Sequence, residues 1–262
     1  MILDEIALYA KERVLNDIKK VGRDEIREHA LALPRGEHRF YSALKSARVA
    51  VICEVKKASP SKGVISKSFD YINIACEYER IGATAISVLT EPKWFLGSDE
   101  IFLQIRQTVN AALLRKDFTV DEYQIYQAKV MGADSVLLIC SLLSQKQLQE
   151  YLAICDKLGI DALVETHDES EINIANGVGA KIIGVNNRNL NNFEVDINNA
   201  SRLSEYIDDS AIYVAESGIQ TVDDGLRLLE AGADALLIGE AFMRSDDKGA
   251  FIRKLRGEYD QG

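Results

Sequence analysis

Charged and polar side chains stand at the ends of several apolar runs in this 262-residue chain. The run VICEVKK brings Glu54 and Lys56, ALLRK ends in Lys116, ALVET contains Glu165, and IYVAE ends in Glu216. Lysines and carboxylates that lie close together shift one another's pKa, and such a set supplies both a general acid and a general base near neutral pH. If the fold brings these run ends together, they predict an acid–base catalytic site.

Glu54 and Lys56 lie two residues apart, so their side chains point to the same side of a strand. A purely structural ion pair explains these two residues equally well, because a buried charge must pair or be neutralised. Three carboxylates and two lysines at one place exceed what packing requires, and this favours a catalytic set. The polar end of the run IIGVN adds Asn186 to it.

The elements that must position these residues form a repeat. A glycine-containing phrase, an apolar run and a polar end recur eight times, which predicts strands near 49–55, 85–90, 113–117, 134–140, 161–166, 181–186, 211–216 and 235–239. Continuous apolar runs are typical of parallel strands covered by helices on both faces. We therefore predict one (β/α)8 TIM barrel domain over residues 1–262, in which all strand ends open on one face.

Residues 1–47 precede the repeat and carry apolar residues at helical spacing. We expect an N-terminal helical extension packed on the barrel, because the segment is too short for its own core; a disordered leader is the alternative. Helices between the strands are expected to close on glycine, and Thr221 is expected to cap one of them.

Glycines follow the seventh and eighth predicted strands, at Gly218 and Gly239. Many barrels bind phosphate with these two loops, where backbone N–H groups approach the ligand closely. A simple turn would explain either glycine alone. Glu240 is unfavourable beside a phosphate, so only its backbone amide is expected to help.

Two long connections and three aromatic residues lie beyond the strand ends. We interpret residues 56–70 as a mobile loop that closes over substrate, or as a longer surface loop, and residues 186–200 as a second extended loop. Trp94, Phe95 and Phe118 are either core aromatics or the lining of a pocket for a planar ring.

The composition excludes several classes of protein. A net charge of −10 argues against a nucleic-acid or membrane-surface binder, but not against a phosphorylated small molecule held by local lysines and amides. Four cysteines without a CxxC pair, no signal peptide and no apolar stretch of about 20 residues indicate a cytoplasmic protein with reduced thiols.

Metal and nucleophile chemistry find no support in the sequence. The three histidines are scattered, so we expect no metal site, and we expect no cofactor. We expect His167 to point away from Glu165 and to belong to a loop. Ser217 has no partner histidine, which argues against an acyl-enzyme mechanism.

The stretches EVKKASPSKG, SVLTEPKWFLGS, LLRKDF, LVETH, GVNNRNL, AESGI and GEAFM resemble the indole-3-glycerol phosphate synthase family over nearly the whole chain. The resemblance implies a decarboxylating, dehydrating ring closure of 1-(2-carboxyphenylamino)-1-deoxy-D-ribulose 5-phosphate, without cofactor or metal. A monomer or weak homo-oligomer is expected.

The resemblance also implies a role for each matching residue. Lys116 would protonate the ribulose carbonyl oxygen, and Lys56 would lie near the substrate carboxylate and assist the dehydration. Glu165 would transfer protons, and Glu54 would orient the lysines or act as a base. Asn186 would contact an oxyanion or a hydroxyl group, and Glu216 and Ser217 would order the substrate hydroxyls. Arg188 would supply a supporting charge, and the phosphate would be contacted by Ser59, Gly218, Gly239 and the Glu240 amide. Which lysine serves which step stays open. The family often has serine or threonine at the position of Glu240.

Two other functions are weighed against this one. A phosphoribosylanthranilate isomerase needs one acid and one base, which would leave the second lysine unexplained. A catalytically idle barrel that binds a sugar phosphate or a partner is disfavoured because Lys56, Lys116 and Glu165 are all present.

Overall fold

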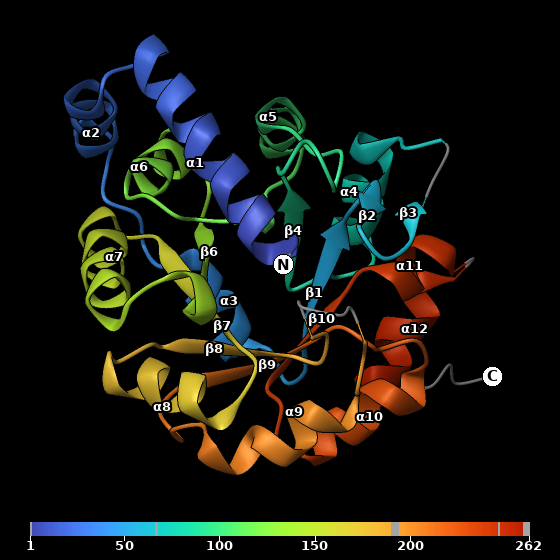
Figure 1. Cartoon of the computed structure of the whole chain (residues 1–262). Coiled ribbons are helices and arrows are strands. Elements are labelled where there is room, and N and C mark those ends of the chain that lie inside the picture. Colours follow the sequence, from blue (N-terminus) through green and yellow to red (C-terminus); the bar gives the residue numbers. More distant parts are fainter. Residues whose placement is uncertain (1, 66–67, 190–193, 246, 259–262) are drawn as a thin grey trace.

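A computed structural model describes residues 2–65, 68–189, 194–245 and 247–258 of the chain. Eight parallel strands close into a barrel around which helices alternate with them, so the predicted (β/α)8 fold is confirmed (Figure 1). In order around the barrel, the strands are β1 (Ala50–Val55), β4 (Ala85–Leu89), β5 (Ala112–Lys116), β6 (Ser135–Ile139), β7 (Asp161–Thr166), β8 (Ile182–Asn186), β9 (Ile212–Glu216) and β10 (Ala235–Ile238), which pairs with β1. Each predicted strand lies within one residue of these bounds.

The helices and the short elements between the barrel strands complete the repeat. They are the hairpin β2 (Ala58–Ser59) and β3 (Gly63–Val64), α4 (Tyr71–Arg80), α5 (Asp99–Thr108), α6 (Tyr123–Val130), the 3-10 turn η1 (Cys140–Leu142), α7 (Gln145–Leu158), α8 (Glu169–Gly177), α9 (Asn198–Leu203), η2 (Ser204–Tyr206), α10 (Val222–Glu230), α11 (Glu240–Arg244) and α12 (Lys248–Leu255). Thr221 accepts a hydrogen bond from the Asp224 amide and caps α10 as predicted. Gly82 and Gly132, which follow α4 and α6, have φ of 83° and 82°, the left-handed conformation that favours glycine after a helix.

The strands are buried on both faces, and alternation along each strand divides the core into two clusters. On β1, Ala50 and Ile52 pack inside the barrel, whereas Val51, Cys53 and Val55 pack against the surrounding helices. This two-residue period points the polar strand ends of the predicted set inward, toward the carboxyl-terminal mouth.

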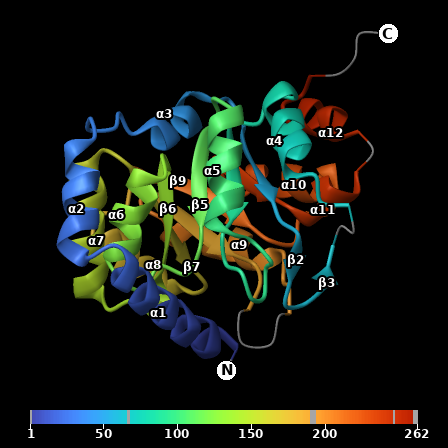
Figure 2. The same cartoon turned by 90° about the horizontal axis from the view of Figure 1, so that it is seen from above.

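Three helices precede the barrel and rest on it, so the alternative of a disordered leader is wrong for residues 2–46. They are α1 (Ile2–Lys20), α2 (Arg23–Ala32) and α3 (Arg39–Ser46). Figure 2 shows α1 and α3 at opposite ends of the barrel. From α3, Phe40 and Leu44 bury their side chains under the barrel, and from α1, Ile6 and Ala10 join the cluster that contains Phe118 near the mouth.

The long connection after β1 contains the β2–β3 hairpin, and its residues 66–67 lie outside the described part of the chain. The extended loop after β8 has an isolated bridge between Arg188 and Val195, and its residues 190–193 also lie outside that part. No helix within the described ranges combines the length and the apolar character that a membrane crossing requires.

Candidate active site

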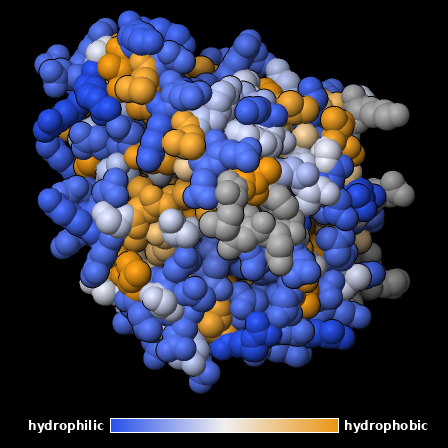
Figure 3. Space-filling model, viewed as in Figure 1, coloured by the Kyte–Doolittle hydropathy of each residue, from blue (hydrophilic) through white to orange (hydrophobic). Residues whose placement is uncertain are grey.

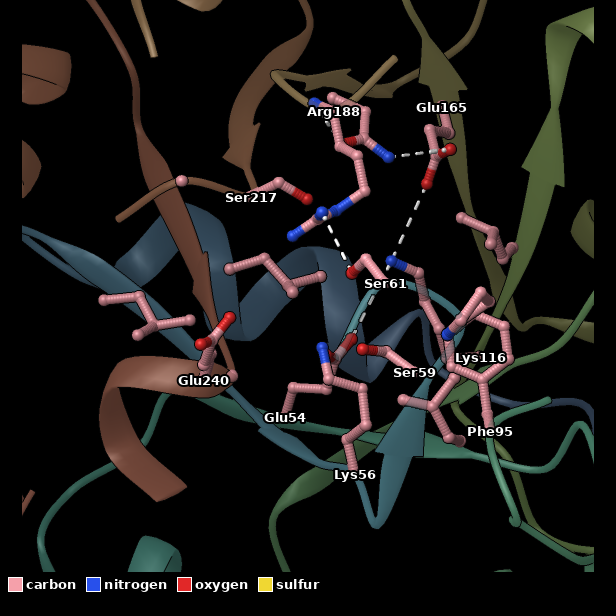
Figure 4. A pocket seen from close by; sticks show the side chains of 18 of the residues that line it. Glu54, Lys56, Ser59, Ser61, Phe95, Lys116, Glu165, Arg188, Ser217 and Glu240 are labelled. Atoms are coloured by element: carbon pink, nitrogen blue, oxygen red, sulfur yellow. Dashed lines mark hydrogen bonds and ion pairs between the residues drawn. The ribbon is translucent and has the colours of Figure 1, made fainter. Parts of the chain in front are cut away.

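The polar strand ends meet in one cavity at the mouth of the barrel. β1, β5, β7 and β8 contribute Glu54, Lys116, Glu165 and Asn186 to its lining (Figure 4). β9 brings Glu216, whose carboxylate lies 2.8 Å from the Lys116 Nζ. The convergence predicted from the run ends is therefore present in the structure.

Lys116 lies among three carboxylates at the floor of this cavity. Its Nζ is 2.8 Å from Glu216 Oε2, 3.6 Å from Glu165 Oε2 and 3.9 Å from Glu54 Oε2. Burial lowers the pKa of Lys116, but the charges of Glu216, Glu165 and Glu54 outweigh burial and raise it above the ordinary value. The ammonium therefore carries a proton throughout the neutral range.

The pKa values of Glu54 and Glu216 are shifted in opposite directions although both side chains are buried. Burial raises the pKa of Glu54, but the charges of Lys56 and Lys116 outweigh it and the net pKa is lowered. Lys56 Nζ donates a hydrogen bond of 2.5 Å to Glu54 Oε1. For Glu216, burial and the charges of Glu165 and Glu54 outweigh Lys116 and raise the pKa to about 7. The site thus combines a carboxylate that is ionised at pH 7 with a carboxyl group that titrates there.

Gly184 makes room for the Glu216 carboxylate inside the barrel. It lies on β8 two residues before Asn186, and a Cβ at this position would lie 2.2 Å from Glu216 Oε1. That oxygen is buried and has no hydrogen-bond partner among the described residues, whereas the other oxygen accepts from Lys116. A side chain at position 184 would push Glu216 away from the lysine.

Asn186 connects Glu165 to the loop that follows β8. Its Nδ2 donates to Glu165 Oε1 over 3.1 Å, and its Oδ1 accepts from the backbone N–H of Arg188 over 2.9 Å. The Arg188 guanidinium donates to Ser61 Oγ over 3.2 Å, so the loops after β8 and β1 meet at the cavity, as Figure 4 shows.

The predicted phosphate-binding residues line the same cavity. They are Ser59, Gly218, Gly239 and Glu240, accompanied by Ser217. Ser217 and Gly218 have φ of 65° and 84°, and the left-handed conformation is uncommon for a residue other than glycine. The Glu240 carboxylate lies 3.0 Å from Arg244 and 3.9 Å from Lys62, so two cations compensate its charge.

Comparison with known proteins adds to this geometry. The family model described as indole-3-glycerol phosphate synthase matches residues 3–255. The chain belongs to this family. It is similar to proteins named indole-3-glycerol phosphate synthase from Ruminiclostridium cellulolyticum, at 52% identity over 98% of this chain and 99% of the relative, and from Endomicrobium trichonymphae, at 47% over 98% and 100%. A relative of the same name from Lachnoclostridium phytofermentans is 44% identical over 98% of this chain and 99% of its own.

Two of the three aromatic residues line the cavity of this family member. The rings of Phe95 and Phe118 lie 5.9 Å apart between centroids and form an apolar wall. Trp94 is absent from the lining, and its ring instead meets Tyr9 of α1 edge-on at 5.7 Å. The buried Glu91 accepts hydrogen bonds from the N–H groups of residues 93–95. These bonds hold the loop in a conformation in which the Trp94 and Phe95 rings point in different directions.

His167 lies in the loop after β7 as predicted, but the predicted direction of its side chain is wrong. His167 lies two residues after Glu165, so strand alternation places both side chains on the same side, and its Nε2 lies 3.5 Å from Glu165 Oε1. Its Nδ1 lies 3.2 Å from Glu171 Oε2. The prediction gave the two residues opposite sides, although residues two positions apart share a side.

An ion pair between α1 and the end of β5 had no signal in the sequence. Arg13 donates to both carboxylate oxygens of the buried Asp117, over 3.0 and 2.6 Å. The Thr90 hydroxyl and the Phe118 N–H donate to the same carboxylate, which adjoins Lys116 in the chain. The pair spans 104 residues, so no local pattern predicts it. Among the described residues, no cluster of three or more His, Cys, Asp or Glu is suited to hold a metal ion.

Proposed function

We propose that the charged side chains at this barrel mouth carry out the reaction of the indole-3-glycerol phosphate synthase family in this chain. That reaction converts 1-(2-carboxyphenylamino)-1-deoxy-D-ribulose 5-phosphate to indole-3-glycerol phosphate, CO2 and water in tryptophan biosynthesis, and the enzyme is a carbon–carbon lyase. The observation that carries the proposal is the buried Lys116 ammonium, held by Glu54, Glu165 and Glu216 at the floor of a cavity with an aromatic wall.

Lys116 is the general acid of the ring closure. The aromatic carbon attacks the ribulose carbonyl, and the Lys116 ammonium donates a proton to the carbonyl oxygen as negative charge develops there. Protonation of Glu216, whose pKa is raised to about 7, removes the nearest anion from the lysine and eases release of its proton. Loss of CO2 from the same ring carbon then restores the aromatic ring.

Glu165 takes up and returns protons during these steps. It lies 3.6 Å from Lys116, and its other oxygen accepts from Asn186. Asn186 contacts the developing oxyanion or a hydroxyl group of the substrate, and Glu216 with Ser217 orders the substrate hydroxyls.

The dehydration needs an acid and a base on opposite sides of the leaving hydroxyl. Lys56 lies near the substrate carboxylate and assists as the acid, while Glu54 orients the lysines or acts as the base. The hydrogen bond from Lys56 to Glu54 places this acid and this base in direct contact.

The phosphate and the anthranilate ring of the substrate bind to different walls of the cavity. Ser59, Gly218, Gly239 and the Glu240 amide bind the phosphate, with Arg188 as a supporting charge. Phe95 and Phe118 take the anthranilate ring and exclude water from it. Trp94, predicted to join them, packs against Tyr9 of α1 instead.

The direct test mixes the protein with the carboxyphenylamino ribulose phosphate and follows indole absorbance and fluorescence. Lys116→Ala is expected to lower kcat roughly 10³-fold, within the range of general acid catalysis, while substrate binding remains measurable. Lys181→Ala removes a lysine that is 67% exposed and precedes β8 at the other end of the barrel, and it is expected to leave turnover unchanged. A wild type without indole product would overturn the function, and full turnover in Lys116→Ala would overturn the role of the lysine.

We further infer a single barrel domain that acts as a monomer or weak homo-oligomer in the cytoplasm. On the face in Figure 3, hydrophobic residues occur in separate patches on a mostly hydrophilic surface, which supports weak self-association. Cys53, Cys76, Cys140 and Cys155 are free thiols, which suits a reducing compartment. Sedimentation equilibrium over a range of concentrations tests the oligomeric state.

A further inference from the structure

Asn187 joins the loop after β8 to the turn after β9, beside the proposed phosphate site. The residue directly follows Asn186 at the end of β8 and is only 3% exposed. Its Nδ2 donates to the Ser217 carbonyl over 3.1 Å, and its backbone N–H donates to the Glu216 carbonyl over 2.9 Å. One residue of the neighbouring loop therefore holds two consecutive carbonyl groups at the exit of β9.

The remaining polar groups of Asn187 are also hydrogen-bonded. Its Oδ1 accepts from the backbone N–H of Ala200 in α9 over 2.8 Å, and its backbone carbonyl accepts from the N–H of Asp196 over 2.9 Å. Rotation of the side chain would leave buried donors and acceptors without partners, which is costly. The amide that meets Ser217 is therefore fixed in direction.

The turn that Asn187 holds has an unfavourable backbone conformation. Ser217 has a φ of 65°, and the left-handed region is costly for residues other than glycine. Such a conformation persists where neighbouring groups hold it. Gly218 follows with a φ of 84°, and a Cβ at this position would lie 2.8 Å from Val195 Cγ1, so the loop after β8 packs closely against the turn.

The bond from Asn187 also sets the direction of the next backbone N–H. The C=O and N–H groups of a trans peptide point in opposite directions, so the Gly218 N–H points away from Asn187. Within the described ranges this N–H donates no hydrogen bond to the protein. Ser217, labelled in Figure 4, and Gly218 both line the catalytic cavity. A backbone N–H held in this way is suited to bind an anionic oxygen.

We propose that Asn187 is a positioning residue for the phosphate end of the substrate, because its side chain holds the Ser217 carbonyl so that the Gly218 N–H faces the phosphate. The inference rests on the proposed phosphate site. The phosphate does not react, so its contacts stabilise the bound substrate and the transition state equally, and their loss raises KM without lowering kcat. The backbone bond from residue 187 to Glu216 does not depend on the side chain and remains in Asn187→Ala.

The first test compares Asn187→Ala with the wild type in the indole assay. The loss of a hydrogen bond to a charged group should raise KM roughly 10- to 100-fold, while kcat changes less than about twofold. Asn176→Ala is the matched control, because Asn176 also joins two loops, donating to the Tyr206 carbonyl over 2.7 Å and accepting from the Asp208 N–H over 3.3 Å. It lies at the end of α8 that precedes β8, at the other end of the barrel, and the variant is expected to keep both constants.

Two competitive inhibitors separate the phosphate end of the cavity from its ring end. In Asn187→Ala the Ki of inorganic phosphate should rise by the same factor as KM, whereas the Ki of anthranilate, which fits the wall of Phe95 and Phe118, should change less than about twofold. A general loosening of the cavity would weaken both inhibitors. If the alanine variant does not fold, Asn187→Asp carries the same expectation, because it keeps an acceptor for Ala200 but lacks the donor for Ser217.

Relief of the backbone strain completes the test. Glycine adopts the left-handed conformation without support, so in a Ser217→Gly background Asn187→Ala should raise KM less than about threefold. An unchanged KM in Asn187→Ala, equal weakening of both inhibitors, or an undiminished effect in the Ser217→Gly background would overturn the inference. A wild type without indole product would instead overturn the proposed function, and an active wild type that inorganic phosphate does not inhibit would remove the phosphate site on which the inference rests.

Discussion

Replacing Glu216 with glutamine should stabilise the protein at alkaline pH even though the residue lies at the centre of the site. Glu216 is 1% exposed, and its pKa is raised from the ordinary 4.5 to about 7 by burial and by the charges of Glu165 and Glu54, against the attraction of Lys116. The folded protein therefore binds this proton more tightly than the unfolded chain does. The stabilisation is complete below pH 4.5 and is lost as pH rises through 7.

The size of the effect follows from the two pKa values. The gap between 4.5 and about 7 corresponds to about 3 kcal/mol, since each unit is worth about 1.36 kcal/mol. Between pH 5 and pH 8 the wild type should thus lose about 2 to 3 kcal/mol of unfolding free energy that Glu216→Gln retains. Glutamine has nearly the same shape as the protonated carboxyl group and cannot ionise.

Urea unfolding followed by circular dichroism at pH 5, 6, 7 and 8 measures this difference. Glu230→Gln, an exposed carboxylate at the end of α10, is the control and should run parallel to the wild type. If Glu216→Gln also runs parallel to the wild type, the argument that burial holds the proton on Glu216 is refuted.

Two other substitutions test the framework of the site. Gly184→Ala places a Cβ 2.2 Å from Glu216 Oε1, so kcat in the indole assay should fall at least about tenfold and the unfolding free energy by about 1–3 kcal/mol. The control Gly177→Ala, whose Cβ would have no atom closer than 4.0 Å, should change neither kcat nor the unfolding free energy. A fully active Gly184→Ala would contradict the close fit. Arg13→Ala leaves the buried Asp117 without its main cation, so urea unfolding at pH 7 should show a loss of about 3 kcal/mol. Arg13→Lys should recover part of it, and equal stability of all three proteins would exclude a contribution of the pair.

The strand ends were predictable because a buried parallel strand leaves a long apolar signal that stops where the side chains reach the mouth. The inward direction of Glu54, Lys116 and Glu165 followed from the two-residue period of the strand. The same period could have identified Gly184, which faces inward one step before Asn186.

Prediction failed for two residues that lie beyond the strand ends. His167 was placed on the side opposite Glu165, although residues two positions apart share a side, and hydrogen bonds with Glu171 and Asn199 hold it in the bend after β7. Trp94 and Phe95 are adjacent in sequence, yet the loop held by Glu91 sends one ring to α1 and the other to the cavity.

By itself the sequence determined the barrel, the helical extension and the set of ionisable groups that share the mouth, because these depend on local periodicity and on burial. Only the tertiary structure decided which groups pair. Lys116 meets Glu216 across 100 residues, and Arg13 meets Asp117 across 104. Such contacts form only when the barrel closes and the side chains pack. The opposite pKa shifts of Glu54 and Glu216 also depend on the tertiary structure, because burial and the distance to each neighbouring charge determine those shifts.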